Sequence, residues 1–193
     1  MRARVLLFGI VLYGSVVNGQ SKRYDSSMKL GKAGFRVSCN NKSAEKNTVT
    51  ISPIGFESTA HEISIEIKGK VAKAEVDDLN NDGFPDLVMY VYNGGAKNTG
   101  TVVGVSSEQN EGFAPIFFPD LLDDQKLKVG YMGSDEFLLM EGTLMRKFPI
   151  YNTTDTANSK PTGTMRQIQY RVVSGDRGSQ KVKVTRSYEL NKQ

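Results

Sequence analysis

Alternating hydrophobic and polar residues dominate the chain after its N-terminal segment. In the stretch EISIEIKG, Ile63, Ile65 and Ile67 would lie on one face of a strand, with polar residues on the other. This pattern predicts a half-buried strand. The same alternation, bounded by Gly, Pro, Asn or Asp, predicts half-buried strands in NTVTISPI, AKAEV, LVMYVY, TVVGVS, EFLLMEG, LMRKFPIY, MRQIQYRVV and KVKVTRSYEL.

The predicted strands are joined by short turns, which favours antiparallel pairing because parallel neighbours need long crossovers. One segment, PDLLDDQKLKVG, predicts a short helix with Asp120 as its N-cap. The expected fold is therefore all-β, an antiparallel β-sandwich or open barrel with one short helix. In its last two strands we expect these residues to face inward: Ile168, Tyr170, Val172, Val182, Val184, Tyr188 and Leu190.

The N-terminal segment MRARVLLFGIVLYGSVVNGQ has the layout of a secretory signal peptide. Two arginines precede an apolar run over residues 5–13, and short residues precede Gln20. An uncleaved membrane anchor is the alternative, but the apolar run is shorter than the roughly 20 residues that a bilayer span needs. We expect cleavage after Gly19, a signal peptide at residues 1–19, and a single domain at residues 20–193 in the periplasm or outside the cell.

The charge bears on the class of partner, and the cysteine content bears on disulfide and thiol chemistry. The 193 residues carry a formal net charge of +4, and removing residues 1–19 leaves 174 residues and a charge of +2, because Arg2 and Arg4 are lost. The basic residues are scattered, so we expect no nucleic-acid partner. Cys39 is the only cysteine, which excludes an intramolecular disulfide and favours a small buried side chain over a reactive thiol.

The segment DLNNDGFPD between two predicted strands has the spacing of a calcium-binding loop. Oxygen-bearing side chains recur at every second position around Gly83, and calcium prefers six to eight oxygen ligands. Met89 stands where an EF-hand has its bidentate glutamate, and the flanks are strands, so an EF-hand is excluded. The alternative is a tight turn whose side chains bond their own backbone. The candidate metal ligands are Asp78, Asn80, Asp82, the backbone carbonyl of Phe84, and Asp86.

The sequence offers little for catalysis. His61 is the only histidine, and no GxSxG motif accompanies it. A single histidine and a single cysteine also exclude a His/Cys zinc cluster. The acidic pairs Asp123–Asp124 and Asp135–Glu136 are interpreted as solvated turn residues, because neighbours on a strand point to opposite faces. We expect a protein without enzymatic activity.

Several segments, taken in order, resemble the PliI-like family of bacterial periplasmic inhibitors of invertebrate-type lysozyme. They are AEVDDLNNDGFPDLVMYVY, the Gly-rich segment after it, GYMGSDEFLLMEGTLMRKFPIY and KPTGTMRQIQYRVV. The likeness spans about residues 70–173. The earlier segment GFRVSCNNKSAEKN is similar to the branch of such proteins found in Bacteroidetes-like bacteria.

The resemblance implies an exported β-sandwich that acts by binding a lysozyme. In the family's inhibitors, a Ser-Gly-rich loop bearing a tyrosine enters the lysozyme cleft and meets its catalytic carboxylates. The matching segment here keeps the glycines and the position but lacks the Ser-Gly-Ser and Tyr signature. The partner-binding residues that it implies are Asn93, Gly94, Gly95, Lys97, Asn98, Gly100 and Thr101.

The residues of this segment indicate a contact surface on their own as well. Its glycines allow it to protrude, and Lys97 and Asn98 can meet acidic groups of a partner. A longer hairpin turn without a partner is the alternative. The expected function is thus an exported, non-enzymatic inhibitor of invertebrate-type lysozyme. A calcium-stabilised β module with a structural or interaction role at the cell envelope is the second possibility, and an unrecognised hydrolase the third.

Overall fold

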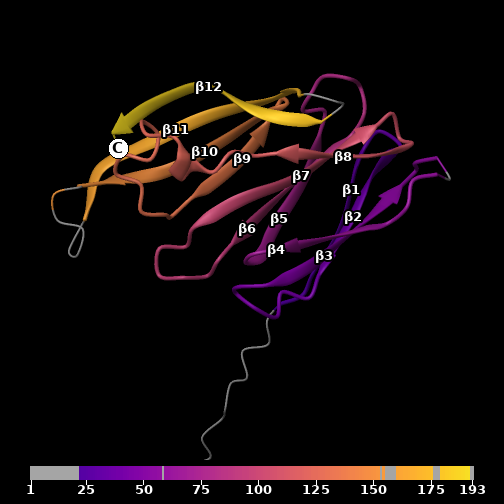
Figure 1. The fold of residues 1–193 in the computed structure, drawn as a ribbon, viewed down its shortest axis with the longest axis horizontal. Coiled ribbons are helices and arrows are strands. Elements are labelled where there is room, and N and C mark those ends of the chain that lie inside the picture. Colours follow the sequence, from indigo (N-terminus) through magenta and orange to yellow (C-terminus); the bar gives the residue numbers. More distant parts are fainter. Residues whose placement is uncertain (1–21, 58, 153, 155–159, 176–178, 192–193) are drawn as a thin grey trace, which may run out of the picture.

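The computed structural model describes residues 22–57, 59–152, 154, 160–175 and 179–191, so the predicted signal peptide lies outside the described residues. Two sheets make up the described part of the chain (Figure 1). The strands are β1 (Tyr24–Leu30), β2 (Ala33–Cys39), β3 (Asn47–Ile54), β4 (Ile63–Ile67), β5 (Lys70–Asp77), β6 (Asp86–Tyr92), β7 (Gly100–Glu108), β8 (Gly112–Phe117), β9 (Glu136–Met140), β10 (Thr143–Tyr151), β11 (Pro161–Ser174) and β12 (Gln180–Asn191). The smaller sheet has the order β1-β2-β3-β4, and the larger has the order β5-β6-β7-β8-β12-β11-β10-β9.

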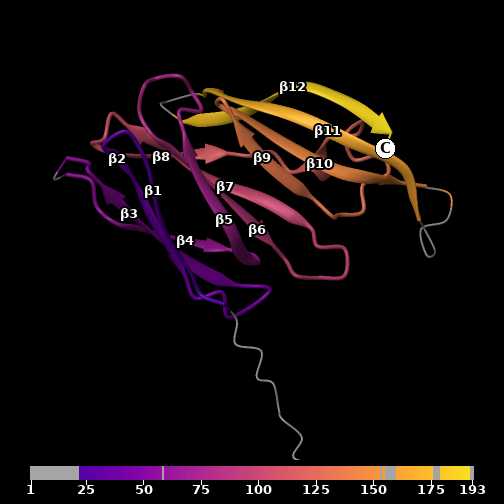
Figure 2. The same cartoon turned by 180° about the vertical axis from the view of Figure 1, so that it is seen from behind.

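The predicted all-β class is confirmed, and the pairing is mostly antiparallel. The exception is a short parallel contact between β12 and β8, where Gln180 pairs with Ile116. The larger sheet curls towards a barrel, and the smaller sheet packs beside β5 and β6 (Figure 2). In the described residues, no helix is long and apolar enough to cross a membrane.

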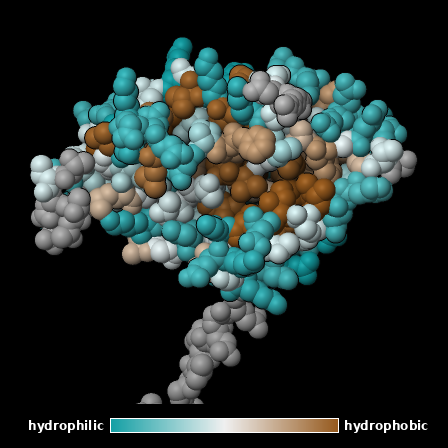
Figure 3. All heavy atoms as spheres, in the orientation of Figure 1, coloured by the Kyte–Doolittle hydropathy of each residue, from teal (hydrophilic) through white to brown (hydrophobic). Residues whose placement is uncertain are grey.

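Strand β6 belongs to two hydrophobic cores at once. Leu87, Met89 and Val91 face the smaller sheet, whereas Val88 and Tyr90 face the inside of the curled larger sheet. LVMYVY forms a strand, as predicted, but the prediction that one of its faces is solvated is wrong. Both faces of β6 are covered. Figure 3 shows hydrophobic residues gathered in the middle of one face, where the two sheets meet, with hydrophilic residues around them.

Most predicted strands are present with the expected faces. Ile67 is buried, and Ile63 and Ile65 pack against the core between the two sheets. The polar residues between them are exposed. Cys39 is buried at the end of β2, as expected for a small core residue, and His61 is exposed. Strands β1, β2 and β8 were not predicted from the alternation.

The inward face of β12 was predicted correctly only in its first half. Val182 and Val184 pack against the core inside the larger sheet, beside the buried residues of β11. Tyr188 and Leu190 are instead exposed, at 38% and 41% of their surface. A bulge at Thr185 shifts the register between β11 and β12, and one extra residue moves every later side chain to the opposite face.

The predicted helix in residues 119–130 is reduced to one 3-10 turn, Leu121–Asp123. Asp120 is its N-cap, as predicted, and its side chain accepts a hydrogen bond from the Leu122 amide. The turn stops because Asp124 has an extended backbone and its Oδ1 accepts bonds from the amides of Lys126 and Leu127, each at 2.9 Å. This local bonding competes with a continuing helix.

Candidate functional site

The connection between β6 and β7 is an exposed loop that protrudes from the larger sheet (Figure 1). Every residue over 93–99 is exposed, and the chain becomes buried only at Gly100, where β7 begins. Thr101 is exposed again on the strand. Most of the partner-binding residues predicted from the sequence thus lie together on the surface, but Gly100 is buried, and its prediction as a contact residue is wrong. We call residues 93–99 the β6–β7 loop.

Hydrogen bonds within the β6–β7 loop give it a defined conformation. The Asn93 amide donates to the Thr99 carbonyl at 3.2 Å and closes the loop. The side-chain oxygen of Asn93 accepts from the amides of Gly95 and Thr99, at 3.2 and 3.1 Å. The Asn98 amide donates to the Gly95 carbonyl at 2.8 Å. Asn93 therefore organises the interior of the loop.

A buried group of side chains fixes the point where this loop joins β7. The carboxylate of Asp135 accepts from the Gly100 amide at 2.7 Å, and Arg146 Nη2 donates to the Gly100 carbonyl at 3.2 Å. Asp135 and Arg146 form an ion pair at 2.7 Å, with side-chain exposures of 0% and 10%. The Tyr131 hydroxyl donates to the same carboxylate at 2.6 Å. We call Tyr131, Asp135 and Arg146 the loop anchor.

The electrostatics of the loop anchor match its burial. Burial acts to lower the pKa of Arg146, but the hydrogen bond and the charge of Asp135 outweigh it and raise that pKa. Burial, together with the bond to Asp135, raises the pKa of Tyr131. The guanidinium also lies over the Tyr131 ring, 5.1 Å from its centre. A charged pair enclosed in this way holds its geometry because each lost partner would leave a buried charge.

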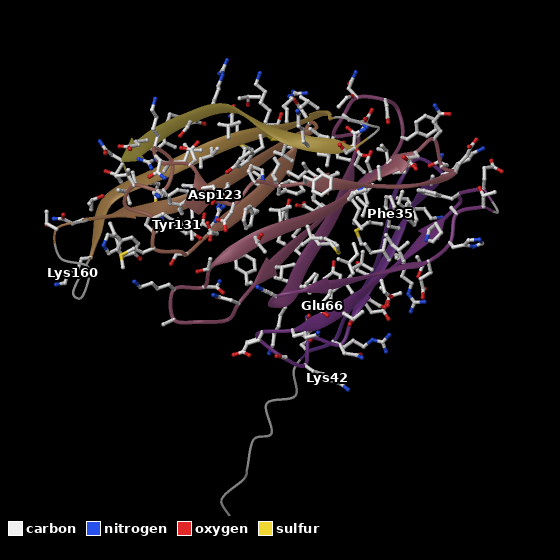
Figure 4. The ribbon with its side chains drawn as sticks, viewed as in Figure 1. Phe35, Lys42, Glu66, Asp123, Tyr131 and Lys160 are labelled. Atoms are coloured by element: carbon white, nitrogen blue, oxygen red, sulfur yellow. The ribbon has the colours of Figure 1, made fainter. Side chains whose placement is uncertain are left out.

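The chain before Asp135 supports the loop from a second side. The Ser134 amide donates to the Lys97 carbonyl at 2.5 Å. Gly133 makes this approach possible, because a β-carbon there would collide with the same carbonyl. Tyr131 lies at the end of the molecule from which the loop protrudes, far from Phe35 (Figure 4). The interpretation of Asp135 as a solvated turn residue is wrong, since its side chain is fully buried.

A basic cavity of about 540 Å³ lies beside the loop, with Gly94 in its wall. Lys22, Arg23 and Lys70 contribute positive charge to its lining. Asp25 also lines the cavity, but its carboxylate pairs with Arg23 and Arg36, at 3.0 and 2.9 Å. The hydrogen bond from Arg36 holds the pKa of Asp25 below its ordinary value. The surface next to the loop is thus net positive.

The chain matches no protein-family model, and no curated protein matches its sequence. The exposed β6–β7 loop and the basic cavity that Gly94 lines form one candidate interface, and the buried loop anchor supports it from below.

The predicted metal-binding loop between β5 and β6 is a tight turn built by its own side chains. Asp78 accepts from the amides of Asp82 and Gly83, at 3.0 and 2.9 Å, and Asp82 accepts from the Phe84 amide at 2.8 Å. These bonds are those of the turn alternative. In the described part of the chain, no three His, Cys, Asp or Glu side chains converge closely enough to hold a metal ion.

Asp86 differs from the other acidic residues of this turn because it is fully buried. Its Oδ2 accepts from the amides of Leu79 and Asn80, at 2.8 and 3.3 Å. Its Oδ1 is also buried and has no hydrogen-bond partner. Burial raises the pKa of Asp86 to about 6, although the Ser106 hydroxyl and the two amides oppose that shift.

Proposed function

We propose that the protein is an exported, non-enzymatic binding protein that inhibits an invertebrate-type lysozyme by placing the β6–β7 loop in the enzyme's cleft. One observation carries the proposal: the loop is exposed along its whole length, yet hydrogen bonds fix both its interior and its base. It is also the segment that the resemblance to PliI-like proteins assigns to the lysozyme cleft.

The rigidity of the loop supports a role in binding. A flexible loop would lose conformational entropy when it enters a cleft, and a loop already held in one conformation loses less. The bonds made by Asn93 and by the loop anchor supply that preorganisation. A connection that only reverses the chain does not require a buried ion pair at its base. The pair formed by Asp135 and Arg146 therefore supports a further role for the loop.

The charge of the surface supports an acidic target. Glycosidases of this kind use a pair of carboxylates at the scissile bond, so the cleft is negative. Lys97 is exposed on the loop, and the basic cavity beside Gly94 extends the positive surface. Complementary charge favours fast and specific association. Because the Ser-Gly-Ser and Tyr signature is absent, we assign the contacts to Lys97, Asn98 and the glycine backbone.

A cell-wall clearing assay tests the proposal. Purified protein is titrated against invertebrate, chicken and goose-type lysozymes, and we expect inhibition of the invertebrate type. In the proposed complex Lys97 is enclosed by the cleft, so Lys97→Ala should weaken inhibition by about 1.5–3 kcal/mol, roughly 10- to 150-fold. Lys183→Ala, which removes an exposed lysine of β12, is the matched control and should leave inhibition unchanged.

Two outcomes would count against this function. Full lysozyme activity at a large molar excess of the wild-type protein removes the inhibitor role. Inhibition that survives deletion of residues 94–98, in a variant that melts like the wild type, places the contact on another surface. Loss of inhibition in Lys97→Ala that is no greater than in Lys183→Ala places Lys97 outside the enclosed contact.

Export is part of the same proposal and rests on the signal-peptide layout of residues 1–19. N-terminal sequencing of the protein expressed in a Gram-negative host should give a first residue at or near Gln20 in the periplasmic fraction. An intact Met1 in the soluble cytosolic fraction would contradict it.

A further inference from the structure

The outer side of the larger sheet, which faces away from the inside of its curl, is only partly covered. Leu87 and Met89 of β6 and Val105 of β7 face the smaller sheet, which packs over that part. Strands β9, β10, β11 and β12 lie at the other end of the sheet order, and Figures 1 and 2 show them away from the smaller sheet. We call the outer side of these four strands the outer β9–β12 face.

Hydrophobic side chains are gathered on the outer β9–β12 face. Leu144 of β10 and Ile168 of β11 lie in the core of the larger sheet, so the residues that alternate with them point outward. Half of the eight large hydrophobic residues that are exposed in the described part of the chain lie on this face: Leu138, Met140, Tyr188 and Leu190. Exposed hydrophobic residues gathered in this way, instead of scattered singly, mark an interaction surface.

Cross-strand contacts make this hydrophobic surface continuous. Met145 of β10 lies opposite Leu138 of β9, at a separation where side chains of neighbouring strands touch. Gln167 of β11 donates through Nε2 to Met145 Sδ at 3.4 Å and to the Tyr188 hydroxyl of β12 at 2.7 Å. A row of contacting side chains therefore crosses all four strands, from Leu138 to Tyr188.

The same face carries an excess of positive charge. Five basic residues of these strands point outward in the observed register: Lys147, Arg171, Lys181, Lys183 and Arg186. In the described part of the chain, none of them takes part in an ion pair. Glu136, opposite Lys147, is the acidic residue that these strands place on the face, whereas Glu189 pairs with Arg166 on the other side. Figure 4 shows side chains with nitrogen ends projecting from β12, away from the rest of the sheet.

The charge and composition of the face select among possible partners. A second copy of the chain would bring the same excess of positive charge, and like charges oppose self-association. Lysine is depleted at protein–protein interfaces, whereas three of the five basic residues here are lysines. Anionic lipid headgroups attract lysine and arginine near a bilayer surface, and tyrosine is enriched at the same depth. The face therefore fits an anionic bilayer better than a protein.

We propose that the outer β9–β12 face docks the protein reversibly on the surface of an anionic lipid bilayer. The basic side chains bind the headgroups, and Leu138, Met140 and Tyr188 enter the boundary between headgroups and acyl chains, as the apolar face of an interfacial amphipathic helix does. Figures 1 and 2 show the β6–β7 loop on a different side of the molecule from β12, so the docked protein still presents this loop. The inference goes beyond the proposed function and does not depend on it.

Sedimentation with lipid vesicles tests the inference. Purified protein is mixed with vesicles of phosphatidylcholine and phosphatidylglycerol, and separately with vesicles of phosphatidylcholine alone. We expect the protein to sediment with the anionic vesicles at low salt and to stay in solution with the neutral ones. Raising the salt to about 1 M shortens the Debye length to about 3 Å and should release the bound protein.

Matched substitutions locate the contact on the outer β9–β12 face. Lys183→Gln combined with Arg186→Gln removes two cations and should weaken vesicle binding roughly fivefold per charge, or about 25-fold together. Leu138→Ser should weaken binding by roughly three- to tenfold, because half of the surface of this side chain is still exposed before docking. The control combines Lys29→Gln with Lys68→Gln, two exposed lysines at the smaller sheet, which changes the net charge equally and should leave binding unchanged.

The inference is overturned if the wild-type protein does not sediment with anionic vesicles at low salt. It is equally overturned if the control weakens binding as much as Lys183→Gln with Arg186→Gln, since net charge alone would then explain the binding, or if Leu138→Ser has no effect. A dimer in analytical ultracentrifugation that Leu138→Ser dissociates would assign the face to a second copy instead. Lysozyme inhibition is measured without lipid, so either proposal can fail without the other.

Discussion

Asp86 shows how one buried residue couples the fold to pH. Its pKa is raised to about 6 by burial, whereas an aspartate in the unfolded chain titrates near about 3.9. The folded state therefore holds this proton more tightly than the unfolded state. The contribution of Asp86 to the free energy of unfolding is most favourable below pH 4 and falls as pH rises to about 6, by about 3 kcal/mol in the absence of a metal.

Urea unfolding at several pH values between 4 and 7, in chelator, measures this contribution. Other carboxylates titrate in the same range, so the informative quantity is the free energy of unfolding of the wild type minus that of Asp86→Asn, which cannot ionise. We expect that difference to fall as pH rises. A constant difference would show that the carboxyl is solvated in the folded protein.

The elements around the β6–β7 loop depend on the buried ion pair of the loop anchor. Asp135→Asn keeps the shape of the side chain but leaves the Arg146 charge without its partner, and breaking a buried pair costs about 3–5 kcal/mol. We expect that loss in urea unfolding. Amide exchange at Gly100, whose N–H bonds to the Asp135 carboxylate, should become faster.

An exposed ion pair provides the comparison for the loop anchor. Lys46 and Glu66 lie 2.6 Å apart with side-chain exposures of 69% and 64%. Lys46→Ala should therefore lower the free energy of unfolding by no more than about 1 kcal/mol.

The Asp135→Asn variant also tests the loop anchor directly. Unchanged amide exchange at Gly100 in this variant would show that the anchor does not hold the loop.

Alternation along the sequence predicts strands well where one face is solvated and the register is regular. It predicts the buried side chains of β11, such as Ile168 and Tyr170, because their neighbours are polar. Phe35, Val37 and Cys39 alternate in the same way, and would have been enough to predict β2. Strand β8 is harder, since Pro115 argues against a strand, and the polar β1 has few apolar residues to count.

Other features depend on contacts that a local pattern does not contain. The bulge at Thr185 turns Tyr188 and Leu190 outward, and it exists only in the pairing of β11 with β12. The exposed loop at residues 93–99 was predictable from its glycines. Its anchor was not, because Asp135 and Gly100 are 35 positions apart and Asp135 and Arg146 meet only through the fold.

At the scale of the whole molecule, the two cores are joined by a shared strand. Alternate residues of β6 supply each core: Met89 packs between the sheets and Val88 inside the larger sheet. A substitution that loosens the packing of either core thus affects the backbone of β6. Since β6 also runs from the β5–β6 turn to the β6–β7 loop, both of these connections depend on its position.

We therefore predict that the described part of the chain unfolds as one cooperative unit. Phe35 lies in the core between the sheets and Phe148 in the core of the larger sheet, and both are fully buried. Phe35→Ala and Phe148→Ala should each lower the free energy of unfolding by about 3–5 kcal/mol. Because β6 joins the cores, calorimetry should show a single transition in both variants, moved to lower temperature. Tyr188→Ala, which shortens an exposed aromatic side chain, should change stability far less. Two separate transitions in either core variant would mean that the small sheet melts without the large one, and that β6 does not couple them.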